Sequence, residues 1–208
     1  MKQRMFILAL GLAFASLAVR AQESDVRVGL GVSFAQNLFI GSTTNLYYPV
    51  NFTTFSIPLF LTKNFRIEPD FGLLTYSDER TLSDKSVDGR SSTQMRIGMA
   101  LQYMIRNLGG SENVAAYVGP HVDILPTSTK DTFTGSVDRT SSRTDLVIGL
   151  ECGGEYSFAK CFSIGGEVQL NYIGIGETTT SPPSSSTTSE SEHFINVSSS
   201  VVVRWFFN

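Results

Sequence analysis

Apolar and polar residues alternate with a period of two along most of the chain. In residues 145–158, Leu146, Ile148 and Leu150 occupy even positions, while the odd positions carry mostly glycine and acidic residues. Such alternation predicts a β-strand whose two faces meet different surroundings. Residues 22–208 show no helical period.

The alternation predicts eight strands, at residues 26–34, 46–62, 65–73, 95–105, 114–124, 145–158, 162–175 and 194–207; the second is clear only in its latter half. Three connections are short, at 63–64, 106–113 and 159–161. The other four, mostly rich in Ser and Thr, are long, at 37–45, 78–91, 126–142 and 176–193. Alternately long and short connections predict an antiparallel up-and-down sheet with all the long loops at one end.

The polar face of these strands mixes small residues with charges, as expected of a narrow, self-paired barrel interior. It predicts an interior charge network of Arg66, Glu68, Asp70, Arg96, Asp123, Glu151, Glu155, Glu167 and Arg204, and places Arg27 and Asp145 on the same face. We expect Arg204 to pair with Glu167, Glu155 or Glu151. Because acids outnumber arginines, some carboxylates must share protons, meet water or bind a cation.

The apolar face is aromatic near the short connections. Its rings are Phe65, Tyr103, Tyr156, Phe158, Phe162, Trp205 and Phe207. A girdle of aromatic side chains at one level is typical of a membrane–water interface. The sequence therefore predicts an all-β fold: an eight-stranded antiparallel transmembrane barrel with its apolar face toward lipid.

The first residues predict a secretory signal peptide. Lys2 and Arg4 precede an apolar run at 5–17, which is too short to span a membrane. Val19 and Ala21 then supply small residues at the two positions that a signal peptidase reads. We expect cleavage after Ala21, which leaves 22–208 as one barrel domain.

Composition narrows the classes of partner and cofactor. A net charge of −3 without a basic stripe argues against nucleic acid. The predicted hairpin places Cys152 opposite Val168. Cys161 is seven residues from Val168 along the same strand, so the two cysteines are about 23 Å apart at the usual strand rise. We therefore expect no disulfide, and with no Cys/His cluster we expect neither a metal nor any other cofactor.

Three alternatives remain open. A lipid-modifying enzyme would need an outward His–Ser pair, but His121 lies on the inward face and His193 at a loop rim. A narrow gated pore would have to pass through a barrel with room only for side chains. A secreted lipocalin-like ligand carrier would need the apolar face inside.

The closing VVVRWFF, the signal peptide and the four long loops resemble small bacterial outer-membrane barrels of the OmpA/OmpX-like kind. The segment FSIPLFLTKNFRIEPDFG is similar to the second hairpin of the PorT-like barrel family. The resemblance implies a monomer in outer-membrane lipid whose Trp205 and Phe207 are read by the barrel-assembly machinery, although here Asn208 follows the final aromatic. It further implies a non-enzymatic role in which outer loops are displayed for envelope structure or surface contact.

Overall fold

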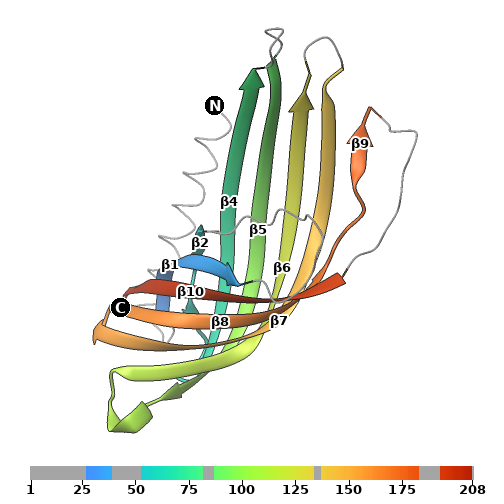
Figure 1. The fold of residues 1–208 in the computed structure, drawn as a ribbon. Helices are drawn as coiled ribbons and strands as arrows, with labels where there is room; N and C mark the ends of the chain where they lie inside the picture. The colour runs from blue at the N-terminus through green and yellow to red at the C-terminus, as the bar shows by residue number, and fades with distance from the viewer. Residues whose placement is uncertain (1–26, 39–52, 82–86, 134–136, 183–192, 208) are drawn as a thin grey trace.

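The computed structural model describes residues 27–38, 53–81, 87–133, 137–182 and 193–207. Nearly all of them are strand (Figure 1). The elements are β1 (Arg27–Leu38), β2 (Thr53–Ser56), β3 (Leu59–Phe60), β4 (Phe65–Thr81), β5 (Val87–Arg106), the 3-10 turn η1 (Leu108–Gly110), β6 (Val114–Thr132), β7 (Arg139–Ala159), β8 (Phe162–Gly174), β9 (Thr179–Ser181) and β10 (His193–Phe207). The predicted signal peptide, the 37–45 loop beyond residue 38 and the first half of the second strand lie outside these residues.

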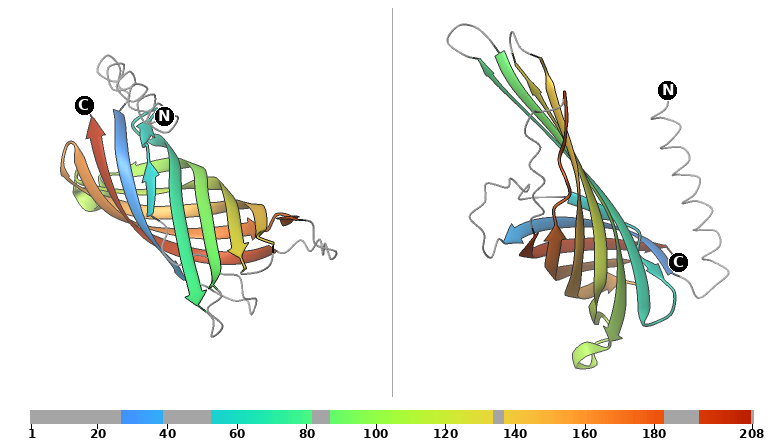
Figure 2. Two further views of the ribbon diagram at one scale, coloured as in Figure 1. Left: turned by 90° about the horizontal axis from the view of Figure 1, so that it is seen from above. Right: turned by 90° about the vertical axis from the view of Figure 1, so that its right-hand side faces the viewer.

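The sheet closes on itself into an eight-stranded antiparallel barrel, as predicted. β2 and β3 together form the second of the eight strands, and β9 pairs separately with β7. Each of the eight strands pairs with the next around the barrel, and β10 returns to pair with β1 from Val28↔Phe207 to Leu38↔Val197. The two ends of the sheet lie side by side in Figure 2. Closure gives the backbone of the last strand partners on both sides, because β8 pairs with its other edge.

The second strand crosses the wall in two pieces, β2 and β3. Pro58 separates them, since it has no N–H to donate to the sheet. Its carbonyl still accepts a 2.9 Å hydrogen bond from the backbone of Gly29, and Ile57 donates one of 2.9 Å to Pro69. The break thus interrupts the regular ladder without opening the barrel.

The short connections lie together at one end of the barrel, and one of them needs glycine. Between β5 and β6, Asn107 has φ 59°, Gly109 φ 64° and Gly110 φ 79°. Glycine adopts positive φ without the steric cost that other residues meet. The Gly-Gly pair of this turn therefore allows the chain to reverse within a few residues.

At the opposite end the strands are longer than the sequence predicted. β4 and β5 stay paired to Thr81↔Val87, and β6 and β7 to Asp131↔Arg139. The expectation of long loops at 78–91 and 126–142 was therefore wrong for most of those residues. Within 176–193, β9 pairs with β7. These strands form a sheet extension that rises beyond the barrel wall (Figures 1 and 2).

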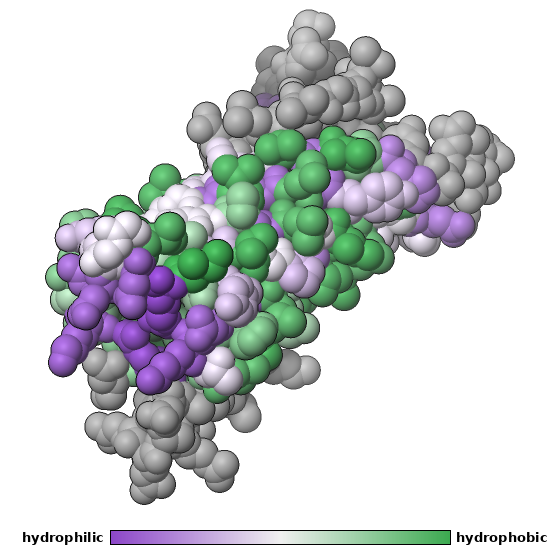
Figure 3. Space-filling model, turned by 90° about the horizontal axis from the view of Figure 1, so that it is seen from below, coloured by the Kyte–Doolittle hydropathy of each residue, from purple (hydrophilic) through white to green (hydrophobic). Residues whose placement is uncertain are grey.

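The wall is apolar outside and polar inside, in the predicted parity. Leu101, Ile148 and Leu170 are exposed on the outer surface, whereas Arg66, Asp123 and Arg204 are buried inside. Figure 3 shows apolar side chains gathered over the middle of one face, with hydrophilic ones concentrated at one end. A lipocalin-like carrier needs the reverse arrangement, so the structure contradicts that alternative.

The outer apolar band has the height of a membrane. On β5 its side chains run from Met95 to Ile105, a separation of ten residue steps or about 33 Å at the usual strand rise. A strand tilt of about 40° reduces this to about 25 Å, the height of the apolar band on outer-membrane barrels. Among the described residues, no helix is long and apolar enough to cross a membrane.

The β7–β8 register agrees with the sequence-based hairpin. Cys152 lies opposite Val168, as predicted. Cys152 is exposed on the outer surface, Cys161 lies in the turn before β8, and both thiols are free.

The charged interior as candidate functional site

Two arginines occupy the interior near the short-turn end. Arg204 on β10 lies 2.9 Å from Glu68, 3.2 Å from Glu155 and 3.7 Å from Glu167, measured between nitrogen and carboxylate oxygen. Arg66 on β4 lies 3.2 Å from Glu68 and 3.0 Å from Glu155. The two guanidinium groups thus share two carboxylates. The pairing considered for Arg204 included Glu155 and Glu167 but missed Glu68, and Glu151 is not among its ion pairs here.

Neutral side chains complete this network. Gln102 accepts a hydrogen bond from Arg66 and donates one to Glu151. Tyr117 donates a 2.9 Å hydrogen bond to Glu167, and the guanidinium carbons of Arg66 and Arg204 lie 4.8 Å and 5.2 Å from the centroid of its ring. Inward glycines make room for these groups: a Cβ on Gly153, opposite Tyr117, would lie 2.5 Å from its ring.

A packed apolar layer closes the interior at the short-turn end. It consists of Phe60, Met104, Tyr117 and Phe206, all buried, with Ala115 against them. Phe60 and Phe206 are 5.5 Å apart between ring centroids. At the rim, Arg27 lies 4.9 Å from the Phe206 ring and donates a hydrogen bond to the carbonyl of Lys160. Arg27 therefore covers this layer from outside and does not join the charge network.

A second set of charges lies farther from the short turns. Arg96 on β5 reaches Asp70 and Asp123, with nitrogen–oxygen distances of 3.1 Å to each. His121 is buried and forms a 2.7 Å hydrogen bond with Asn171, while its distance to the Asp123 carboxylate is 3.8 Å. His121 is thus held by the amide of Asn171 more closely than by the Asp123 carboxylate.

Asp145 marks the base of the sheet extension. Its fully buried carboxylate lies 2.9 Å from Arg143 and accepts a 3.0 Å hydrogen bond from the backbone N–H of Gly176. It therefore ties β7 to the segment that follows β8.

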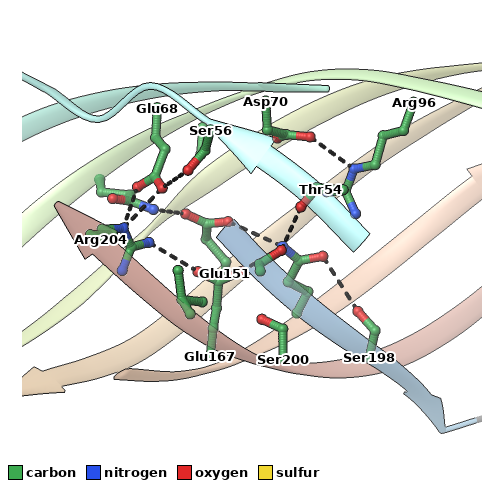
Figure 4. Close-up of a pocket in the computed structure, with 15 residues that line it drawn as sticks. Thr54, Ser56, Glu68, Asp70, Arg96, Glu151, Glu167, Ser198, Ser200 and Arg204 are labelled. Carbon is green, nitrogen blue, oxygen red and sulfur yellow. Dashed lines mark hydrogen bonds and ion pairs between the residues drawn. The ribbon is translucent and has the colours of Figure 1, made fainter. Parts of the chain in front are cut away.

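Carboxylates outnumber arginines in the lumen. Three arginines, Arg66, Arg96 and Arg204, face six acids, Glu68, Asp70, Asp123, Glu151, Glu155 and Glu167. The charge set predicted from sequence therefore gathers in one lumen. A cavity of about 30 Å³ lies among these groups, room for about two waters. Figure 4 shows Glu68 and Asp70 on one side of it and Glu167, Ser198 and Ser200 on the opposite side.

The interior network predicted from the sequence contained only charged residues and missed the neutral side chains that lie between them. Gln102, Met104 and Tyr117 stand at inward positions by the same parity that placed Arg96 and Asp123 inside. Their size was the available signal, because a large neutral side chain at an inward position must fill part of the lumen. For Phe60 the signal was weaker, because the strand breaks at Pro58 two residues earlier.

The predicted aromatic girdle lies on the outer surface near the short turns. Neighbouring rings contact one another, with centroid distances of 5.3 Å for Phe65–Tyr103, 4.9 Å for Tyr156–Phe158, 6.0 Å for Phe158–Phe162 and 6.1 Å for Phe162–Trp205. Trp205 and Phe207 both point outward from β10.

The ionisable groups of the lumen are engaged with one another in ion pairs and hydrogen bonds. Among the described residues, no three His, Cys, Asp or Glu side chains group as a metal-ligand set. His193 is exposed, and its ring stacks on Tyr172 with centroids 5.5 Å apart.

Comparisons with known proteins place the chain in a family. Residues 6–198 match the family described as outer membrane protein beta-barrel domain. A major outer membrane protein from Thermus thermophilus has the same fold, with a TM-score of 0.53 and 12% identity over 88% of this chain and 100% of that one. Ail, the attachment invasion locus protein of Yersinia pestis, solved with the heparin analogue sucrose octasulfate, gives a TM-score of 0.50 and 10% identity over 87% of this chain and 96% of that one.

No curated protein matches the chain. The family match covers most of the sequence, and both solved structures share the barrel. The chain belongs to the outer membrane protein beta-barrel domain family, and it is an integral β-barrel of the bacterial outer membrane.

Proposed function

We propose that this protein is a non-enzymatic outer-membrane barrel that presents a polar sheet extension at the cell surface, for envelope structure or surface contact. One observation carries the proposal: β4 to β7 continue seven or eight residues beyond the apolar band. At the usual strand rise, that is about 25 Å of hydrogen-bonded sheet outside the membrane.

The extension has the composition of a solvated surface. Hydroxyl side chains pair across its strands, as Ser92 does with Thr129 at 3.1 Å. Its charges also pair: Arg90 lies 3.4 Å from Asp131, and Lys130 lies 2.8 Å from Asp138. A near-neutral, hydroxyl-rich sheet suits contact with polar partners better than electrostatic capture of a highly charged one.

The rest of the molecule supports a passive barrel. Buried ion pairs and the layer of Phe60, Met104, Tyr117 and Phe206 fill the lumen, which argues against free passage of solutes. His121 is engaged by Asn171 inside the barrel, where an outer lipid cannot reach it. We further propose a monomer, cleaved after Ala21, whose exposed Trp205 and Phe207 are recognised by the assembly machinery.

Cysteine labelling tests the display of the extension. In a background with Cys152→Ser and Cys161→Ser, Ser128→Cys adds one thiol on the extension and Lys160→Cys adds one at a short turn; both positions are exposed. In intact cells, a membrane-impermeant maleimide is expected to label Ser128→Cys, and Lys160→Cys only after permeabilisation. The reverse pattern would put the extension in the periplasm and contradict the proposal.

A further inference from the structure

We propose that the short-turn end of the barrel binds the phosphate group of an anionic phospholipid. Four cations lie at this end and are called the basic rim: Arg27 at the start of β1, Arg106 at the end of β5, Lys63 in the β3–β4 turn and Lys160 in the β7–β8 turn. In the three short connections, at 61–64, 107–113 and 160–161, Glu112 is the only acid. Positive charge therefore predominates at this end of the barrel.

The described part of the chain supplies no counter-ion to the basic rim. Among the described residues, no carboxylate oxygen lies within 4.0 Å of a side-chain nitrogen of the four cations. Glu155, the last acid on β7 before the turn, is already shared by Arg66 and Arg204. Uncompensated positive charge at the mouth of the barrel attracts an anion from outside the chain.

Two backbone carbonyls hold the arginines of the rim in place. Arg27 Nη2 donates a hydrogen bond to the carbonyl of Lys160, and Arg106 Nε donates one of 2.6 Å to the carbonyl of Lys63. The guanidinium carbons of Arg27 and Arg106 lie 5.7 Å and 5.0 Å from the centroid of the same Phe60 ring, so they are within about 11 Å of each other. Side chains that are already fixed lose little conformational freedom when a ligand binds.

The free N–H groups of both arginines suit a phosphate. Arg27 uses only Nη2, and its buried Nε has no hydrogen-bond partner among the described residues. Arg106 is exposed, and its hydrogen bond to the described chain uses Nε, which leaves Nη1 and Nη2 for a ligand. A guanidinium presents its donors in a planar fork that matches phosphate oxygens. A phosphate has several oxygens and can therefore accept from more than one cation of the rim.

The aromatic girdle sets the basic rim at the height of lipid headgroups. Lys160 lies between the girdle residues Phe158 and Phe162, and Lys63 lies two residues before Phe65. Aromatic belts mark the membrane–water interface, where the phosphates of phospholipids are found. An anionic phospholipid fits better than a zwitterionic one, because the headgroup cation of the latter would face the positive rim.

Native mass spectrometry of the protein purified from membranes in a non-ionic detergent tests the site. The probes are phosphatidylglycerol and phosphatidylcholine with identical acyl chains, added in equal amounts, and inorganic phosphate in a separate sample. We expect a phosphatidylglycerol molecule to stay bound to the folded barrel after phosphatidylcholine has been stripped. Its Kd should be lower by about tenfold, the factor for one further charge-assisted contact.

Variants of equal charge assign the site. Arg27→Gln with Arg106→Gln should abolish the preference for phosphatidylglycerol. Arg90→Gln with Lys130→Gln removes the same charge from the sheet extension, where both cations pair with acids, and should keep the preference. If the arginine variant fails to fold, Lys63→Gln with Lys160→Gln decides, because both lysines are exposed in turns and their loss should weaken the same preference.

Three results would overturn the proposal. The first is equal retention of the two lipids by the unmodified protein. The second is an undiminished preference in the folded rim variants. The third is a complex with inorganic phosphate and none with lipid, which would make the rim a site for a soluble anion. None of these outcomes depends on which side of the membrane the sheet extension faces.

Discussion

Replacing Arg204 with alanine is expected to lower the free energy of unfolding of the barrel in micelles by about 3–5 kcal/mol. The side chain is 2% exposed and has carboxylate oxygens of Glu68, Glu155 and Glu167 within 4.0 Å. After its removal Arg66 still pairs with Glu68 and Glu155, but among the described residues no other arginine is ion-paired with Glu167. The penalty arises mainly from negative charge left buried without a counter-ion.

The measurement is the urea midpoint of unfolding at constant detergent concentration. Arg90→Ala is the matched control, because this arginine also pairs with a carboxylate but its side chain is 65% exposed on the extension. An exposed pair contributes about 0–1 kcal/mol, so the control should scarcely move the midpoint. Equal midpoints for Arg204→Ala and the unmodified protein would show that the interior network does not hold the barrel together.

Introducing arginine at Leu150 is expected to cost about 2–4 kcal/mol, the penalty for that residue facing lipid near the bilayer midplane. Leu150 is 58% exposed near the middle of the outer apolar band. At such an exposed position in a water-soluble protein, the same change would fall within about 0.5 kcal/mol. The size of the loss therefore reports what surrounds the outer surface.

Ser142→Arg provides the control for this second prediction. Ser142 lies on the same strand and the same face, eight residues toward the extension, and it is exposed. We expect no measurable change there, because water surrounds the extension. Both proteins would be refolded into lipid bilayers and unfolded in guanidinium. Similar effects at both positions would mean that the apolar band does not define the membrane-facing surface.

The sequence was sufficient to predict the barrel and its faces, because a period of two assigns each residue to one side of the wall. Leu150 and Glu151 are adjacent in the chain, and the structure puts one outside and the other inside. The pairing of β10 with β1 followed from the need to satisfy backbone groups in lipid.

Which charges meet inside could not be predicted from sequence. Glu68 and Arg204 are 136 residues apart, and the stagger of strands around the barrel decides that they face each other across the lumen. The alternation of apolar and polar residues gives the face of each residue but not the stagger between strands. This is why Glu68 was missed as a partner of Arg204 while Glu155 and Glu167 were considered.

The sheet extension escaped prediction for a different reason. Segments such as 126–132 carry Ser and Thr on both faces, so the apolar signal that marks a strand disappears where the strand leaves the membrane. Thr nevertheless suits strands because it is β-branched. Cross-strand pairs such as Ser92–Thr129 continue the sheet where the composition suggested a loop.

The most direct test of the closed barrel with a lipid-facing surface compares the protein in detergent micelles, loaded on a denaturing gel with and without boiling. A closed outer-membrane barrel resists the denaturing detergent until it is heated, and the folded form migrates differently. We expect a clear shift between the two lanes and loss of solubility once the micelles are removed. A single band in both lanes, with a monodisperse protein in plain buffer, would contradict the account.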